Sequence, residues 1–207
     1  PPQGGETGAA IPPVREGIAP FPGAQVVTTF PVARRRGMGK RRIVEYGRYF
    51  EDFEVDATYR HHWGRTVTEG EAALFTTWTM NANPLHFNKV YARALGHPDT
   101  PVNPLFVMNL VFGMTVEDLS EQALAHLGYW RVRFPRPVYP GDTLFATSTV
   151  LDKRPSESKD DRGIVHVRTE GTNQHGEVVI TYERRILVKK RSAYAAPTKA
   201  PGAAEVA

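Results

Sequence analysis

The segment Asn-Ala-Asn-Pro-Leu-His-Phe, residues 81–87, gathers hydrogen-bonding side chains around a proline. His86 carries an imidazole, which can take up and release a proton near neutral pH. Asn81 and Asn83 carry amides, which can orient a water molecule but cannot exchange a proton as a carboxyl group does. Pro84 stiffens the chain between them. The segment therefore predicts a rigid loop that presents an imidazole, with His86 as the candidate base and Asn81 beside it.

Three helices are expected to position this loop. Residues 68–71, Thr-Glu-Gly-Glu, have the pattern of a capping box and predict a helix of about three turns that leads into the loop. Asn88 can cap a short second helix, which Gly96 ends. Asn103 and Pro104 predict the start of a third helix. Because that third helix is apolar on almost every side, we expect it to be buried.

The pattern changes from helices to strands after about residue 125. Four segments rich in β-branched and aromatic residues are separated by turn signals, and they span residues 126–134, 143–154, 164–173 and 177–190. An earlier candidate strand lies near residues 57–67. One buried helix with several strands predicts an α+β fold in which an antiparallel sheet wraps around a central helix.

The order of these motifs resembles the MaoC-like, R-specific enoyl-CoA hydratase family of hotdog folds, over nearly all of residues 48–190. The family loop, Gly-Asp-x-Asn-Pro-hydrophobic-His, is matched at residues 83–86, and Pro-Val-Tyr-Pro-Gly-Asp-Thr-Leu at residues 137–144 matches a second family marker. Within the family, the second half of the chain most resembles dehydratases that interconvert β-methylmalyl-CoA and mesaconyl-CoA. The resemblance implies reversible hydration of a short, branched or carboxylated enoyl thioester.

Hydration of an enoyl thioester needs a base for the water, a proton for the α-carbon and donors for the thioester oxygen. The resemblance implies that His86 is the base and Asn83 supports its loop. It also implies an oxygen-binding N–H at the start of the central helix, no metal or redox cofactor, and a substrate carried by CoA or by acyl carrier protein. The pantetheine arm would enter between subunits, and an open sheet edge also favours a homodimer or a higher even-numbered oligomer.

This sequence departs from the family pattern in three respects. Asn81 stands where the family has a catalytic aspartate. Asn103 and Pro104 stand where many members have His-Gly, and proline offers no N–H. The oxygen donor is therefore expected to be the Leu105 N–H or the Asn103 side chain. Finally, the mesaconyl-CoA relatives carry two hotdog units, whereas this chain has one.

Several residue roles remain open at this stage. His86 fits a structural histidine that closes a loop as well as a base, and Asn81 fits a helix cap as well as a residue that positions water. Arg131 and Arg133, with Arg136, alternate along a predicted strand. They fit a solvated face, or they could bind a substrate carboxylate. The other six histidines lack metal-ligand spacing, so we expect no metal site; they are His61, His62, His97, His126, His166 and His175.

Two other functions are compatible with the pattern. A non-catalytic hotdog subunit that binds acyl-CoA or supports a catalytic partner would account for Asn81 and Pro104. A thioesterase on the same fold would need a carboxylate in or facing the central helix. Glu117 and Asp118 lie at the far end of that helix, so this second alternative ranks lower.

Composition limits the remaining functions. The 207 residues carry a net charge of +4, but residues 43–188 hold 15 Lys+Arg and 19 Asp+Glu, so that segment carries −4. The basic excess therefore lies near the ends, and we expect no nucleic-acid partner. With no cysteine and no apolar run of about 20 residues, we expect a cytoplasmic protein without a membrane partner. The expected organisation is a disordered extension over 1–42, one domain over 43–191 and a flexible tail over 192–207.

Overall fold

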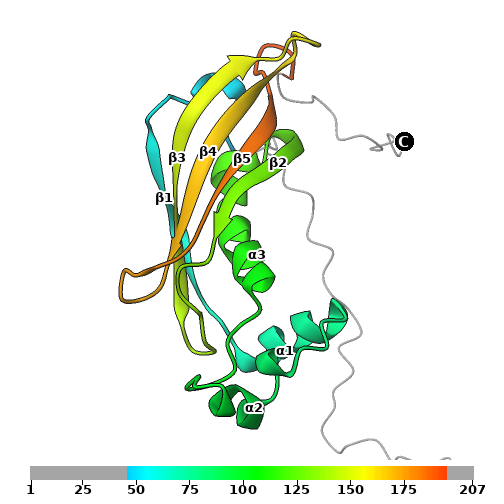
Figure 1. The fold of residues 1–207 in the computed structure, drawn as a ribbon. Helices are drawn as coiled ribbons and strands as arrows, with labels where there is room; N and C mark the ends of the chain where they lie inside the picture. The colour runs from blue at the N-terminus through cyan, green and yellow to red at the C-terminus, as the bar shows by residue number, and fades with distance from the viewer. Residues whose placement is uncertain (1–45, 195–207) are drawn as a thin grey trace, which may run out of the picture. The chain divides into compact units, whose positions relative to one another are not determined.

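The computed structural model describes residues 46–194 (Figure 1). Its strands form one antiparallel sheet in the order β1-β3-β4-β5-β2. The strands are β1 (Thr58–Thr66), β2 (Ala123–Arg133), β3 (Thr143–Pro155), β4 (Arg162–Thr172) and β5 (Val178–Lys189). The α-helices are α1 (Glu69–Trp78), α2 (Lys89–Ala94) and α3 (Pro104–Met114), and a π-helical turn follows at Val116–Ser120. The predicted extension, residues 1–42, and most of the predicted tail lie outside the described residues.

Local sequence signals set the helix boundaries. The Thr68 side chain accepts the N–H of Glu71, which in turn caps the backbone of Thr68, so α1 begins with the expected capping box. Asn88 caps α2 by accepting the N–H of Tyr91 at 3.1 Å. α3 begins after Asn103, as predicted. None of the helices in this part of the chain is long and apolar enough to span a membrane.

α3 packs against one face of the sheet and forms the centre of the main core (Figure 1). Val107, Val111 and Met114 bury their side chains there together with apolar residues of β3 and β5. Gly171 of β4 allows this close approach, because a Cβ at that position would lie 2.6 Å from a methyl group of Val111 and from one of Ile180. The predicted α+β arrangement of an antiparallel sheet around a central helix is therefore confirmed.

The expectation that α3 is buried on every side is wrong. Leu105, Asn109 and Gly113 recur every fourth residue and are exposed, with Leu105 at 59%. Residues four apart lie on one face of a helix, and the sheet covers only the opposite face. α3 therefore presents an uncovered stripe, defined here as these three residues.

β2 forms an edge of the sheet and is largely exposed. Its apolar side chains, and that of the following Phe134, are 36–47% exposed; they are Leu124, Leu127, Tyr129, Trp130, Val132 and Phe134. An unpaired strand edge offers backbone donors and acceptors to another strand. The edge and its apolar side chains thus form a surface suited to association.

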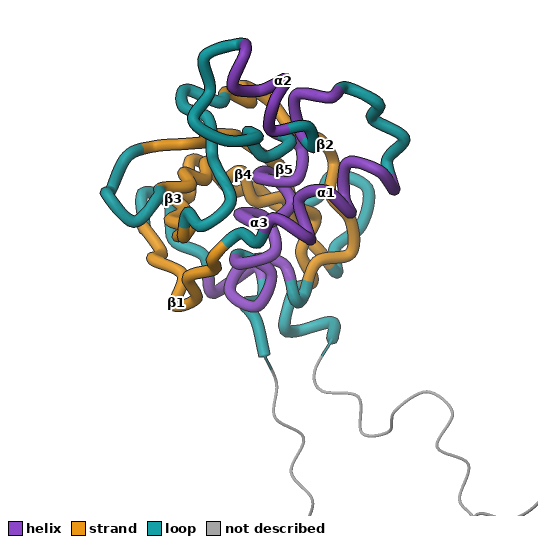
Figure 2. The backbone as a smooth tube through the Cα atoms, turned by 90° about the horizontal axis from the view of Figure 1, so that it is seen from below, coloured by secondary structure: helices purple, strands orange, loops and turns teal. Residues whose placement is uncertain are grey.

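α1, the loop after it and α2 lie beyond one end of the sheet (Figure 1). Figure 2, which views the molecule from below, shows α1 and α2 in front of the strands, with α3 running behind them. The loop that carries His86 is fixed to the segment before α3, because His86 contacts the carbonyl of Pro101. This end of the molecule therefore brings the predicted loop to the N-terminal end of α3.

Candidate active site

Amide side chains fold the loop that carries His86. The Asn81 side-chain oxygen accepts the N–H of Asn83 at 3.1 Å, and the Asn83 side-chain oxygen accepts the N–H of Leu85 at 3.1 Å. Pro84 then begins a 3₁₀ turn that ends at His86. Both asparagines therefore shape the backbone that presents the imidazole, which is the local turn chemistry typical of Asn.

The imidazole of His86 is held in one orientation. Its Nδ1 lies 2.8 Å from the carbonyl oxygen of Pro101. A carbonyl oxygen can only accept a hydrogen bond, so Nδ1 carries a hydrogen and the neutral ring has its lone pair on Nε2. Nε2 has no hydrogen-bond partner within residues 46–194. His86 thus offers a free basic nitrogen.

His86 lines a cleft of about 240 Å³ at the N-terminal end of α3. The walls are mainly apolar and come from the loop, the start of α3, the segment after β2 and the start of β5. The lining residues are Leu85, His86, His97, Pro101, Val102, Pro104, Val107, Phe134, Arg136, Pro137, Val138 and Val179. A mainly apolar cleft with a few polar groups is typical of a small-molecule site. The polar side chains here are those of His86, His97 and Arg136.

His97 was not singled out from the sequence as a site residue. It follows Gly96, whose φ of +89° ends α2 with a sharp turn. Its Nδ1 lies 2.9 Å from the hydroxyl of Tyr139, in the segment Pro-Val-Tyr-Pro-Gly-Asp. Burial, and secondarily the carboxylate of Asp142, raise the pKa of Tyr139, so its hydroxyl keeps its proton. The only sequence signal was a histidine directly after a helix-ending glycine, which is weak.

The predicted arginines occupy different surroundings. Arg131 is 71% exposed, and its Nη1 lies 3.1 Å from Glu183 of β5. Glu183 lies between Tyr182 and Arg184 on that strand. Tyr182 and Arg184 point toward α3, so Glu183 and Arg131 lie on the opposite face of the sheet. Arg133 pairs in register with Thr181. Neither Arg131 nor Arg133 lines the cleft, whereas Arg136 does.

The start of α3 uses its own backbone donors. The Leu105 N–H donates to the Asn103 side-chain oxygen at 3.0 Å, and the N–H groups of Phe106 and Val107 donate to the Asn103 carbonyl. Pro104 has no N–H. At this helix start, the Asn103 side-chain nitrogen has no partner in the described part of the chain, and the Leu105 N–H becomes available to a ligand only if Asn103 turns away.

Asn81 lies in a second, separate hollow. That hollow is lined by Thr77, Met80, Asn81, Ala82 and Phe87, and it shares no lining residue with the His86 cleft. The structure thus brings His86 to the cleft, places Asn83 and Asn103 in the segments that border it, and gives Asn81 a place within the loop.

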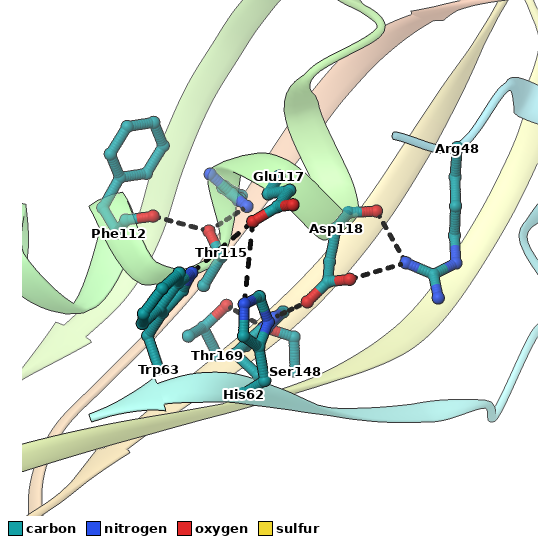
Figure 3. Close-up of polar contacts among 11 residues, drawn as sticks. Arg48, His62, Trp63, Phe112, Thr115, Glu117, Asp118, Ser148 and Thr169 are labelled. Atoms are coloured by element: carbon teal, nitrogen blue, oxygen red, sulfur yellow. Dashed lines mark hydrogen bonds and ion pairs between the residues drawn. The ribbon is translucent and has the colours of Figure 1, made fainter. Parts of the chain in front are cut away.

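A second polar cluster lies near the C-terminal end of α3 (Figure 3). His61 Nδ1 lies 2.8 Å from Asp118 Oδ2, and His61 Nε2 lies 3.0 Å from Ser148 Oγ, which also contacts Thr169 at 2.8 Å. A serine, a histidine and an aspartate in this order can form a nucleophilic triad. However, His61 and Ser148 are only 2% and 1% exposed. The hydroxyl therefore cannot reach a substrate, and the cluster joins β1, β3 and the π-helical turn.

Electrostatics support a structural role for this cluster. Burial lowers the pKa of His61 despite the hydrogen bond from its ring to Asp118, so the ring is neutral near pH 7. Burial acts to raise the pKa of Asp118, but hydrogen bonds from His61 and Arg48 hold that pKa below its ordinary value. Glu117 contacts Trp63 and His62 instead (Figure 3). Both carboxylates considered for a thioesterase are thus engaged away from the His86 cleft.

Residues 46–194 contain no cluster of three or more His, Cys, Asp or Glu residues that could hold a metal ion.

Comparison with known proteins shows which family this chain resembles. The model of the mesaconyl-CoA hydratase family matches residues 29–205. Mesaconyl-CoA hydratase of Cereibacter sphaeroides is 45% identical over 161 residues, which are 78% of this chain and 46% of that protein. β-Methylmalyl-CoA dehydratase of Chloroflexus aurantiacus is 43% identical over 146 residues, which are 70% of this chain and 41% of that protein. The chain therefore spans less than half the length of these two relatives.

Solved structures agree with this match. A MaoC domain dehydratase from Chloroflexus aurantiacus superposes with a TM-score of 0.68 at 41% identity, covering 74% of this chain and 44% of that one. A Mycobacterium tuberculosis protein with a double hotdog fold gives a TM-score of 0.64 at 22% identity, covering 75% of this chain and 47% of that one. The predicted hotdog fold and the MaoC-like resemblance are confirmed. The chain belongs to the mesaconyl-CoA hydratase family.

Proposed function

We propose that this chain provides the catalytic base for reversible hydration of a short, branched or carboxylated enoyl-CoA thioester of the mesaconyl-CoA type. The observation that carries the proposal is the free Nε2 of His86, oriented by the carbonyl of Pro101 at the wall of a mainly apolar cleft. The names of the two curated relatives support the substrate class. No metal or redox cofactor takes part in the proposed reaction.

In the proposed reaction, His86 Nε2 accepts a proton from water as the water oxygen attacks the β-carbon. General base catalysis of this kind requires the nitrogen to be unprotonated near the working pH, which an imidazole satisfies. The thioester oxygen gains negative charge, and we assign its stabilisation to the Asn103 side-chain nitrogen, which is available without rearrangement of the helix start. Leu105 serves this role only if Asn103 gives up its bond.

A carboxylated substrate also needs a cation beside the acyl group. Arg136 lines the cleft, and its Nη1 lies 3.3 Å from Glu177 in an exposed ion pair. A guanidinium binds a carboxylate through two parallel hydrogen bonds. We assign the carboxylate contact to Arg136 in preference to Arg131 and Arg133, because neither of those two lines the cleft.

Association is part of the proposal. The exposed apolar edge of β2 and the uncovered stripe of α3 fit a homodimer or a higher even-numbered oligomer. The same surface fits a second, different hotdog unit, because the relatives are about twice as long as the match.

The test is hydration of mesaconyl-CoA and crotonyl-CoA by the full chain, with His86→Ala, Arg136→Gln and the control His62→Ala. His86→Ala should lower kcat by roughly 100-fold or more on both substrates without loss of folding. Arg136→Gln should raise KM for mesaconyl-CoA but not for crotonyl-CoA, which has no free carboxylate. Full activity in His86→Ala would refute the assignment. A wild type that binds both thioesters but hydrates neither would favour a non-catalytic subunit.

A further inference from the structure

We infer that His97 is the second acid–base residue of this site and supplies the proton that the α-carbon takes up during hydration. This inference rests on the proposed function and extends it to a residue outside the loop of residues 81–87. Its ring lines the same cleft as that of His86.

The reaction needs a second group that exchanges protons. Asn81 stands where a carboxyl group was expected, and an amide cannot act as an acid or a base near neutral pH. Asn81 also accepts the N–H of Asn83 and lies in a different hollow. Among the residues lining the cleft, only His86 and His97 have side chains that can both donate and accept a proton, because a guanidinium has donors but no acceptor.

The surroundings of His97 suit a proton donor. Tyr139 holds Nδ1 at 2.9 Å, and Nε2 has no hydrogen-bond partner among the described residues. A tyrosine hydroxyl can accept from Nδ1–H when the ring is charged, and can accept or donate when the ring is neutral. Tyr139 therefore supports both protonation states without moving the ring. A purely structural tie between α2 and the Tyr139 turn would use Nδ1 alone and would not require His97 to line the cleft.

The proton and electron balance of the step closes with these two residues. Water transfers a proton to His86 Nε2 while its oxygen bonds to the β-carbon, and the π electrons of the double bond move onto the thioester oxygen. Those electrons return as the α-carbon takes the Nε2 proton of the His97 imidazolium. His86 has gained one proton and His97 has lost one. Exchange with solvent restores both residues for the next turnover.

Several charged or titratable groups surround His97, so its part of the pH profile has to be assigned with variants. They come from the loop, the start of α2, the segment after α2, the segment after β2 and the turn before β3: His86, Lys89 paired with Asp99, Arg136, Tyr139 and Asp142. A required base and a required acid together give a bell-shaped pH profile of kcat/KM. In hydration, the acidic limb reports the base His86 and the alkaline limb reports the acid His97.

The variants are His97→Asn, Tyr139→Phe and the control His62→Asn, in the full chain. Asparagine can keep a hydrogen bond to Tyr139 near the position of Nδ1 but lacks Nε2. His97→Asn should lower kcat by roughly 100-fold, change KM by less than about threefold and remove the alkaline limb. Tyr139→Phe should move that limb to lower pH, because it removes the acceptor that favours the charged ring. His62→Asn should match the wild type.

The inference is overturned if His97→Asn keeps wild-type kcat, or if it loses activity while both limbs of the pH profile remain. Should His97→Asn fail to fold, an unchanged alkaline limb in Tyr139→Phe overturns it. The proposed function fails separately, through full activity of His86→Ala. An active His97→Asn beside an inactive His86→Ala would remove His97 from the mechanism and leave His86 as the base.

Discussion

Replacing Asp118 with alanine should lower the free energy of unfolding by about 2–4 kcal/mol. The variant loses the hydrogen bond between His61 and Asp118, and bonds to charged groups contribute about 1.5–3 kcal/mol. It also leaves the buried Nδ1–H of His61 without an acceptor, which costs about 1–3 kcal/mol; the two figures overlap, so they are not added in full. Arg48 is partly exposed and keeps its bond to the Asp118 carbonyl, so its share is at most about 1 kcal/mol.

The loss of unfolding free energy caused by Asp118→Ala should grow as the pH falls from 7.5 to 5.5. The folded-state pKa of His61 is lowered, so the stability that the neutral ring contributes is present above the unfolded pKa of about 6.5 and declines below it. In the wild type, Asp118 raises the His61 pKa against burial and limits that decline. Without Asp118 the His61 pKa falls further, so the variant loses more stability over the same range. Asp118 itself stays ionised there, because its pKa is below 3.8.

Urea unfolding followed by tryptophan fluorescence at both pH values measures this difference. Asp160→Ala is the control, because Asp160 is an exposed aspartate for which the described residues supply no hydrogen bond or ion pair. The reasoning is refuted if Asp118→Ala unfolds within about 0.5 kcal/mol of the wild type at pH 7.5, which is the range of ordinary surface substitutions. It is also refuted if the difference in the free energy of unfolding between Asp118→Ala and the wild type is smaller at pH 5.5 than at pH 7.5.

Two further predictions concern packing and association. Gly171→Ala should destabilise the fold by about 1–3 kcal/mol, because the new Cβ would lie 2.6 Å from Val111 of α3. Gly70→Ala is the control and should not destabilise the fold, because nothing lies within 4 Å of a Cβ at that position. Thermal melting compares the two variants. Leu127→Glu should shift the assembly toward monomer in sedimentation, because Leu127 is 47% exposed on the edge strand and a buried carboxylate would oppose pairing. An unchanged assembly would exclude this edge as the contact.

The helices and strands could be predicted because their signals are local. The capping box at residues 68–71 and the Asn103-Pro104 pair determine where α1 and α3 begin, whatever surrounds them. The four later strands follow from their composition and turn signals. The exposed stripe of α3 could not be read in the same way, because an all-round apolar helix does not indicate which face the sheet will cover.

The position of the arginines depends on irregular backbone in β2. Arg131 has a φ of +50°, and the register of β2 against β5 shifts between Trp130 and Arg133. Strict alternation of side chains, on which a sequence pattern relies, fails where the register slips. The pattern therefore could not separate Arg136, at the cleft, from Arg131, on the opposite face of the sheet.

The sequence did not predict the contact between His97 and Tyr139, for a different reason. The two residues are 42 positions apart and belong to different segments, and neither forms part of a periodic pattern. A histidine outside any sequence motif can be assigned a role only when the fold shows which groups lie beside it. The loop that presents His86 could be predicted because it carries local turn residues before the histidine.

The cleft borders the surface proposed for association, and Phe134 belongs to both. Phe134 lines the cleft and directly follows the exposed edge strand, while Pro104 lines the cleft beside Leu105 of the uncovered stripe. A second unit that covers the edge and the stripe would therefore also approach the cleft and exclude water from it. Water exclusion strengthens the electrostatic interactions on which oxyanion stabilisation depends. If this coupling holds, Leu127→Glu should lose hydration activity in proportion to dissociation, although Leu127 is not among the residues that line the cleft; a fully active monomer would show that one unit suffices.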